Sequence, residues 1–205
     1  MKTSIYLLLD RSGSMETRWG ETINAVNLYF SKIRENAGKN SFRVTMAAFD
    51  MPIDTIDFTV LRDDVPIGKL TEIGVDEVSP RGVTPLYDAI GRLLSMVVKA
   101  NPKRASIVIA TDGRENASRA VVRKTARKRL DAMRERGYDV MFIGVDFDAF
   151  EQAASLGSAK GSVLNTTAGN YAAASQSLSD RTVNYSRTGD AVDFDEEDRR
   201  KASGS

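Results

Sequence analysis

The stretch SIYLLLDRSGSM, residues 4–15, decides the fold of this chain. Its first half is an almost uninterrupted apolar run that stops at Asp10, which is typical of a strand buried on both faces of a parallel sheet. Its second half is a short polar loop in which Gly13 permits a tight turn. A buried strand that leads directly into a polar loop predicts an α/β protein with its functional residues at the carboxyl ends of the strands.

Outward from this strand, helix-like and strand-like segments alternate along the chain. Apolar residues recur every three or four positions in four segments, which predicts helices at residues 19–33, 86–97, 122–133 and 170–185. Apolar runs predict further strands at residues 42–49, 105–111, 139–145 and 162–165, with a short helix at 150–156. Segment 55–61 follows the preceding strand too closely for a helical crossover, so we expect an antiparallel edge strand there. The order predicts a three-layer, doubly wound Rossmann-like fold with a mostly parallel sheet.

Length and composition fit one globular domain with a short tail. The chain has 205 residues, of which 41% are hydrophobic and 28% charged, a balance typical of soluble proteins. Its formal net charge of +1 gives no overall field that would favour nucleic acid or an anionic membrane. The apolar run at residues 5–9 is too short for a signal sequence or a membrane span, so we expect a cytoplasmic location. We assign residues 1–187 to the domain, and the charged residues 188–205 to a disordered C-terminal tail.

The chain contains no cysteine and no histidine, which excludes thiolate and imidazole chemistry. A metal site must therefore be built from oxygen ligands. Two predicted strands end in DRSGSM (residues 10–15) and ATDGREN (110–116), and a third loop lies within SPRGVTPLYDAI (79–90). Together these loops offer two carboxylates and three hydroxyls, a set that suits a small hard cation such as Mg²⁺. The five residues are Asp10, Ser12, Ser14, Thr84 and Asp112.

This pattern resembles the metal-ion-dependent adhesion site of the von Willebrand factor A family, in particular that of short stand-alone members with a TPLYDAI loop and a TDG turn. The resemblance covers about residues 1–187. It implies that Ser12, Ser14 and Thr84 bind Mg²⁺ (or Mn²⁺) directly, while Asp10 and Asp112 act mainly through water. An ion bound by neutral hydroxyls keeps positive character toward an open coordination position, which a partner's Asp or Glu carboxylate can fill. The resemblance therefore implies a divalent-metal-dependent protein–protein interaction module and no enzymatic activity.

Residues beside the five ligands are expected to shape the rim of the site. Met15 is expected either to offer apolar contact there or to pack under the loop. Arg81 is expected either to meet an acidic partner or to be a solvated loop charge. Asp88, in the first turn of the helix after Thr84, is expected to be a surface acid that the helix dipole favours.

Two other functions remain open. One is a structural domain that keeps the fold but binds no metal, with the serines forming ordinary serine turns. The other is a Mg²⁺-dependent phosphoryl-transfer enzyme of haloacid dehalogenase-like layout. In that enzyme Asp10 would be the nucleophile, Asp112 would hold metal, and phosphate would bind Thr84 and Lys99 or Lys103. The chemistry expects a second acid two residues after the nucleophile, where this chain has a serine.

The predicted helix at 122–133 and its flanks are strongly basic. Their charges suggest either a nucleic-acid patch or a solvated helix face. We favour the solvated face, because no aromatic residues interleave with the charges for base stacking. The acidic segment from Asp190 to Asp198 can also fold back and screen them.

Overall fold

Six strands form a single sheet in the order β3-β2-β1-β4-β5-β6. The computed structural model describes residues 2–38, 41–112, 114–145, 147–167 and 169–204. The sheet contains five parallel strands and β3, which pairs antiparallel with β2 at one edge. The strands are β1 (Lys2–Asp10), β2 (Ser41–Asp50), β3 (Asp57–Pro66), β4 (Ala105–Ala110), β5 (Asp139–Val145) and β6 (Val163–Thr166). The predicted mostly parallel sheet with one antiparallel edge strand is confirmed.

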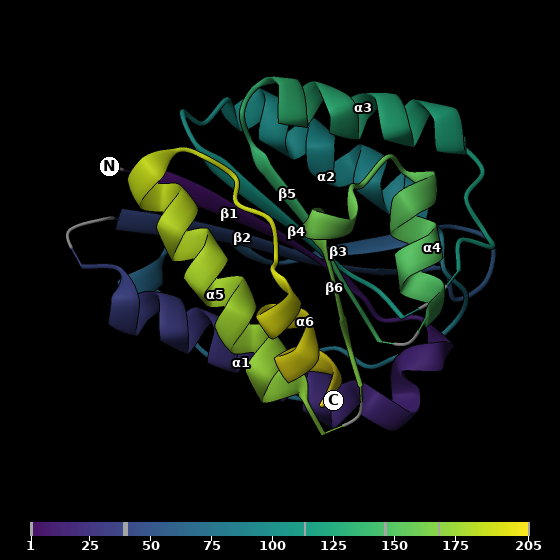
Figure 1. The fold of residues 1–205 in the computed structure, drawn as a ribbon. Helices are drawn as coiled ribbons and strands as arrows, with labels where there is room; N and C mark the ends of the chain where they lie inside the picture. The colour runs from purple at the N-terminus through teal and green to yellow at the C-terminus, as the bar shows by residue number, and fades with distance from the viewer. Residues whose placement is uncertain (1, 39–40, 113, 146, 168, 205) are drawn as a thin grey trace.

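Helices cover both faces of the sheet, which gives the three predicted layers (Figure 1). One face carries α1 (Trp19–Asn36) and α5 (Tyr171–Thr188), and the other carries α2 (Leu86–Ala100), α3 (Arg123–Glu135) and α4 (Phe147–Ser155). The shorter helices are η1 (Gly13–Arg18), η2 (Ile67–Lys69), η3 (Lys160–Ser162) and α6 (Glu196–Ser203). None of the helices in the described ranges is long and apolar enough to cross a membrane.

Strand β1 lies between two apolar layers, one on each face of the sheet. Its side chains alternate between the faces, so that Ile5, Leu7 and Leu9 pack toward α1 and α5. Tyr6 and Leu8 pack toward α2 and α3 on the opposite face. This double burial explains why the sequence of β1 is a continuous apolar run rather than an alternating one.

The strand order reverses at β1, whose two neighbours are β2 and β4. The register aligns Leu9 with Ala48 of β2 and with Ala110 of β4, so the three strands end at the same edge. Ligand sites of doubly wound sheets lie beyond this edge at such a switch point. The loops after β1 and β4 therefore emerge side by side.

Edge strand β3 is longer than the sequence pattern predicted. The expected segment was 55–61, whereas the strand runs from Asp57 to Pro66 with irregular register around Val44 and Met46 of β2. Its second half contains the charged run Arg62 to Asp64, which hides a strand from a search for apolar alternation.

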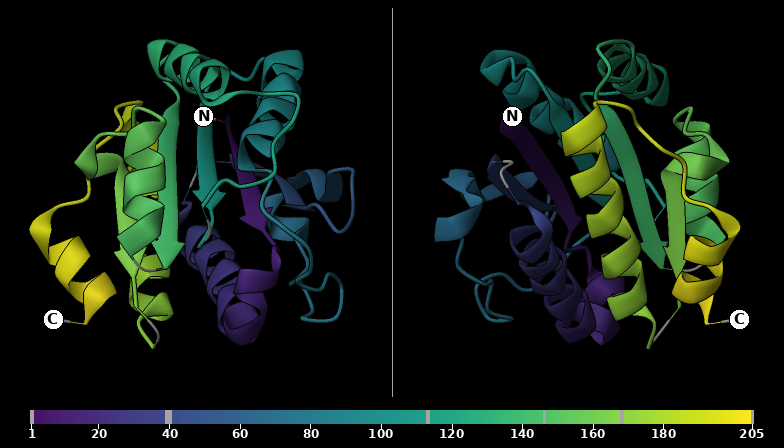
Figure 2. Two further views of the ribbon diagram at one scale, coloured as in Figure 1. Left: turned by 90° about the vertical axis from the view of Figure 1, so that its right-hand side faces the viewer. Right: turned by 60° about the vertical axis from the view of Figure 1, so that its left-hand side comes forward.

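The segment after Thr188 differs from the disordered tail that its composition predicted. Phe194 is buried, and Ala202 is buried on α6, which packs beside β6 and α5 (Figure 2). Asp195 accepts a hydrogen bond from the Asp198 backbone N–H at 2.8 Å, and the Asp198 carboxylate accepts one from the Asp195 N–H at 3.2 Å. Two apolar anchors and this capping box order a segment whose average composition is polar. Helix α6 packs beside β6 and α5 and lies away from α3 in both views, so this part of the acidic segment does not screen the basic helix as expected (Figures 1 and 2).

Candidate metal centre

Backbone hydrogen bonds join the loop after β1 to the loop that carries Thr84. The Gly13 N–H donates to the Gly82 carbonyl at 3.0 Å, and the Arg81 N–H donates to the Arg11 carbonyl at 2.8 Å. Gly82 has a φ of +66°, and a Cβ at this position would overlap the Met51 backbone. The close approach of the Thr84 loop to the backbone of Met51, just after β2, therefore requires glycine at position 82.

Asp10 is fully buried at the end of β1, and both of its carboxylate oxygens are held by the protein. Oδ1 accepts a hydrogen bond from the Ser12 N–H at 2.8 Å, and Oδ2 accepts one from the Thr111 hydroxyl at 2.6 Å. Burial raises the pKa of Asp10 to about 6, although the hydrogen bonds from Thr111 and Ser12 act to lower it. Asp10 is thus positioned rigidly, and a nearby cation would favour its ionised form.

A chain of three oxygen-bearing side chains connects the loops after β1 and β4. The Ser12 and Ser14 hydroxyl oxygens lie 3.1 Å apart, and the Ser14 hydroxyl donates to Asp112 Oδ1 at 2.8 Å. Ser12 is buried, Ser14 is exposed, and the Asp112 side chain is only 2% exposed. The structure therefore brings four of the five predicted ligands to one edge of the sheet.

Thr84, the fifth predicted ligand, is buried just before α2 and is fastened to the Asp112 loop by Asn116. The Asn116 side-chain carbonyl accepts a hydrogen bond from the Thr84 N–H at 2.9 Å, and the Asn116 N–H donates to the Thr84 carbonyl at 3.2 Å. Sequence reasoning missed Asn116, because its contact partner lies 32 positions away.

Asp88 is buried, not a surface acid as predicted. Its carboxylate accepts hydrogen bonds from the backbone N–H groups of Arg119, Ala120 and Val121, at 2.9, 3.1 and 2.6 Å. Asp88 therefore fastens the end of the loop after β4 to α2. Asp88 therefore stabilises a contact between segments about 30 residues apart. Helix-dipole reasoning from the sequence does not reveal such a contact.

The two predicted rim residues are both engaged within the protein. Met15 is buried in the core cluster under α1, so it does not form the rim. Arg81 is half-exposed and donates to Asp50 Oδ2 at 2.9 Å and to Asp57. Arg11 pairs with the same two carboxylates, at 2.9 and 3.0 Å. The charge of Arg81 is therefore shared with this ion network, which ties its loop to β2 and β3.

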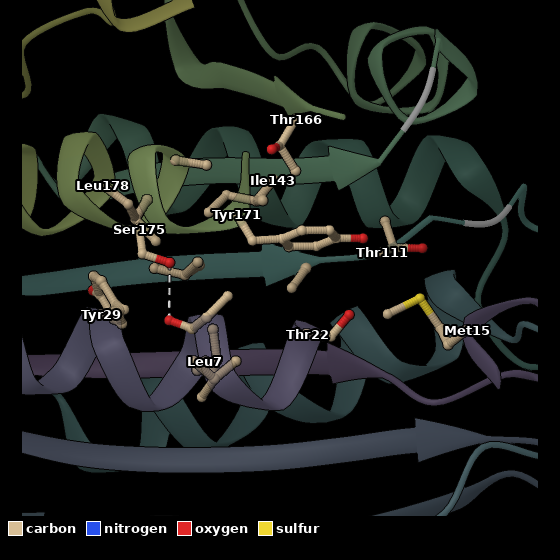
Figure 3. A pocket seen from close by; sticks show the side chains of 15 residues that line it. Leu7, Met15, Thr22, Tyr29, Thr111, Ile143, Thr166, Tyr171, Ser175 and Leu178 are labelled. Atoms are coloured by element: carbon tan, nitrogen blue, oxygen red, sulfur yellow. Dashed lines mark hydrogen bonds between the residues drawn. The ribbon is translucent and has the colours of Figure 1, made fainter. Parts of the chain in front are cut away.

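The loop after β1 lies over an apolar cavity of about 50 Å³ between the sheet, α1 and α5. Met15 and Thr111 line it near the site, and Tyr171 points along it toward Thr111 (Figure 3). At the other end, the Ser175 hydroxyl donates to the Ala25 carbonyl at 2.9 Å and joins α5 to α1. Thr111 connects this core to the site, because it also donates to Asp10.

The donor set fits a small hard cation. In the ranges that the structure describes, no three His, Cys, Asp or Glu side chains form a group that could hold a metal ion. The site offers two carboxylates, which carry two negative charges when ionised, and three neutral hydroxyls. Such a set suits Mg²⁺ or Mn²⁺ and gives no soft metal a preferred ligand.

The lysines that a phosphoryl-transfer site would require lie at the opposite end of the sheet. Lys99 and Lys103 line a groove of about 660 Å³ with Lys2 and Ser4, at the start of β1. Asp10 ends the same strand, eight residue steps of about 3.3 Å further on, or about 26 Å away. The haloacid dehalogenase-like alternative therefore lacks its phosphate-holding residues at the candidate site.

Comparison with known proteins gives a family and a fold. A model of the von Willebrand factor type A domain matches residues 4–181. No curated protein sequence matches the chain. Similar solved structures include proximal thread matrix protein 1 from the mussel byssus, with 17% identity, a TM-score of 0.62, and coverage of 89% of this chain and 46% of that one. The chain therefore spans about half the length of this mussel protein.

Two further structures share the fold. Manganese-loaded TRAP protein of Plasmodium vivax has 15% identity and a TM-score of 0.59, with coverage of 81% of this chain and 68% of that one. A von Willebrand factor type A protein from Catenulispora acidiphila has 11% identity and a TM-score of 0.59, with coverage of 92% and 42%. These identities establish similarity of fold alone.

Proposed function

Because the chain belongs to the von Willebrand factor type A family, we propose that it is an interaction module that binds a protein partner through one divalent cation. The cation is Mg²⁺ or Mn²⁺, and its ligands are the five oxygen-bearing residues at the carboxyl ends of β1 and β4 and before α2. The module has no catalytic role of its own.

The hydrogen-bonded chain from Ser12 through Ser14 to Asp112 carries this proposal. Ser14 and Asp112 are 98 residues apart in the sequence, yet the Ser14 hydroxyl oxygen lies 2.8 Å from Asp112 Oδ1 and 3.1 Å from the Ser12 hydroxyl oxygen. Oxygens this close, next to the buried Asp10 carboxylate, form a compact polar group at the edge of an otherwise apolar sheet. Such a group is suited to bind a small cation of high charge density.

The exposure of the ligands suggests where a partner would bind. Asp10, Ser12 and Thr84 are buried, whereas Ser14 is exposed. An ion held by these residues would therefore face solvent on the Ser14 side. Three hydroxyls cannot complete a six-coordinate shell, so water or an incoming carboxylate would occupy the remaining positions. An Asp or Glu of the partner would gain a charge-assisted bond to the ion and could dominate the interface.

The proposal is tested by capturing partners from the source cell on the immobilised protein, with Mg²⁺ and then with EDTA. A specific partner should be retained in Mg²⁺ and released by chelator. Its affinity for Thr84→Ala should fall by more than about 2 kcal/mol, the usual threshold for a hot spot. Thr71→Ala, on an exposed loop, serves as the matched control. A captured partner with equal affinity for wild type, Thr84→Ala and EDTA-treated protein would show that binding occurs elsewhere on the molecule.

A further inference from the structure

Arg18 lies against one of the two carboxylates of the candidate metal centre. Its Nη1 atom is 3.6 Å from Asp112 Oδ2, while the other oxygen of Asp112 accepts the Ser14 hydroxyl. Arg18 is the last residue of η1, a short helix that begins within the loop after β1 and is anchored in the core by Met15. The position of Arg18 is therefore set by the same segment that carries Ser14.

The burial of the pair is unequal. The Asp112 side chain is 2% exposed, and the Arg18 side chain is 31% exposed. A buried carboxylate is costly unless an opposite charge or hydrogen bonds compensate for its lost hydration. Arg18 supplies this charge from a position that reaches solvent.

The arginines of the neighbouring loops contact different carboxylates. Arg11 and Arg81 lie beside the centre, but they pair with Asp50 and Asp57. Asp10 accepts hydrogen bonds from neutral groups, the Ser12 N–H and the Thr111 hydroxyl. The guanidinium of Arg18 is thus directed at a carboxylate that the metal itself would use.

We propose that Arg18 is an internal counter-cation of Asp112 and competes with the divalent ion for this carboxylate. The inference rests on the proposed function, because it assumes that the centre binds metal. A divalent ion near Asp112 repels the guanidinium, so Arg18 must move away from the carboxylate as the ion enters. Arg18 therefore lowers the metal affinity of the centre and stabilises the metal-free protein.

These two effects have opposite signs, which makes the inference testable. Isothermal titration with Mg²⁺ and with Mn²⁺ at low ionic strength compares wild type, Arg18→Gln and Arg18→Lys. Arg18→Gln should bind metal about three- to tenfold more tightly, because a repulsive charge has been removed. Arg18→Lys keeps the charge and should stay within about twofold of wild type. In EDTA, Arg18→Gln should unfold at a lower urea concentration than wild type, since Asp112 has lost its counter-charge.

Lys32→Gln is the matched control, because it removes the same charge from α1, where Lys32 pairs with Glu35 away from the centre. It should leave the metal affinity within about twofold of wild type. Equal or weaker metal binding by Arg18→Gln would overturn the inference, as would an equal gain in Lys32→Gln. Absence of metal binding by the wild type would overturn the proposed function itself, so the two failures are distinguishable.

Discussion

Replacement of Asp88 by alanine should destabilise the protein without touching any proposed metal ligand. The Asp88 carboxylate accepts hydrogen bonds from three backbone N–H groups, those of Arg119, Ala120 and Val121, and the residue is only 6% exposed. A hydrogen bond to a charged acceptor contributes about 1.5 kcal/mol or more. The donors at 119 and 120 belong to exposed residues and regain some hydration in the variant. We therefore expect the free energy of unfolding of Asp88→Ala to fall by about 3–4 kcal/mol, which is less than the sum of the separate hydrogen bonds.

Asp88→Asn refines this estimate, because Oδ1 accepts the shorter bonds from the N–H groups of residues 120 and 121. Oδ2 accepts the N–H of residue 119 and, at 3.3 Å, that of residue 120. An asparagine can keep the Oδ1 pair and place an amide NH₂ at the Oδ2 position. Its loss should be about 1–2 kcal/mol.

The assay is urea unfolding followed by circular dichroism at neutral pH in EDTA, with the exposed Asp76→Ala as control. Asp76→Ala should stay within about 0.5 kcal/mol of wild type. A loss below about 1 kcal/mol for Asp88→Ala would refute the account of how the loop after β4 is fastened to α2.

Three further outcomes are expected. In EDTA the free energy of unfolding of the wild type should fall by up to about 3 kcal/mol relative to that of Asp10→Asn as pH rises from about 4 to about 7. The reason is that folded Asp10, with a pKa of about 6, keeps a proton that the unfolded chain releases; a pH-independent difference in urea unfolding would contradict this. Phe194→Ala should lower the free energy of unfolding by about 3 kcal/mol or more, because the ring is buried and lies 4.7 Å from the Arg181 guanidinium. An unchanged thermal midpoint would show that the C-terminal segment contributes nothing to stability. Gly82→Ala should lower the free energy of unfolding by more than about 2 kcal/mol, because Gly82 has a positive φ and an added Cβ would clash with Met51. Gly74→Ala, where an added Cβ meets nothing within 4 Å, should lower it little. Equal urea midpoints for the two variants would contradict the loop geometry.

Local sequence patterns were sufficient to predict the sheet and the edge at which the side chains of Ser12, Ser14 and Asp112 meet. The apolar run of β1 indicates burial on both faces, and a polar loop after such a strand indicates the functional edge. These features depend on neighbouring residues only, so they are visible in the sequence. The same reasoning placed helices at the segments that became α1, α2, α3 and α5.

Long-range pairings could not be predicted in this way. Arg18 meets Asp112, and Asn116 meets Thr84, across separations of 94 and 32 residues that no local period encodes. The ordered C-terminal segment was missed for a related reason. Its order depends on single anchors, such as Phe194 under Arg181, which an average over 18 residues conceals.

A crystal grown with Mn²⁺, and measured at the manganese absorption edge, tests the central claim most directly. The account predicts one anomalous peak at the carboxyl edge of the sheet, within bonding distance of the hydroxyl oxygens of Ser12, Ser14 and Thr84. Asp10 and Asp112 should lie just beyond it, and Asp10→Asn should weaken or remove the peak. A peak at another position, or well-ordered loops with no peak at saturating Mn²⁺, would contradict the assignment of these five residues as a metal centre.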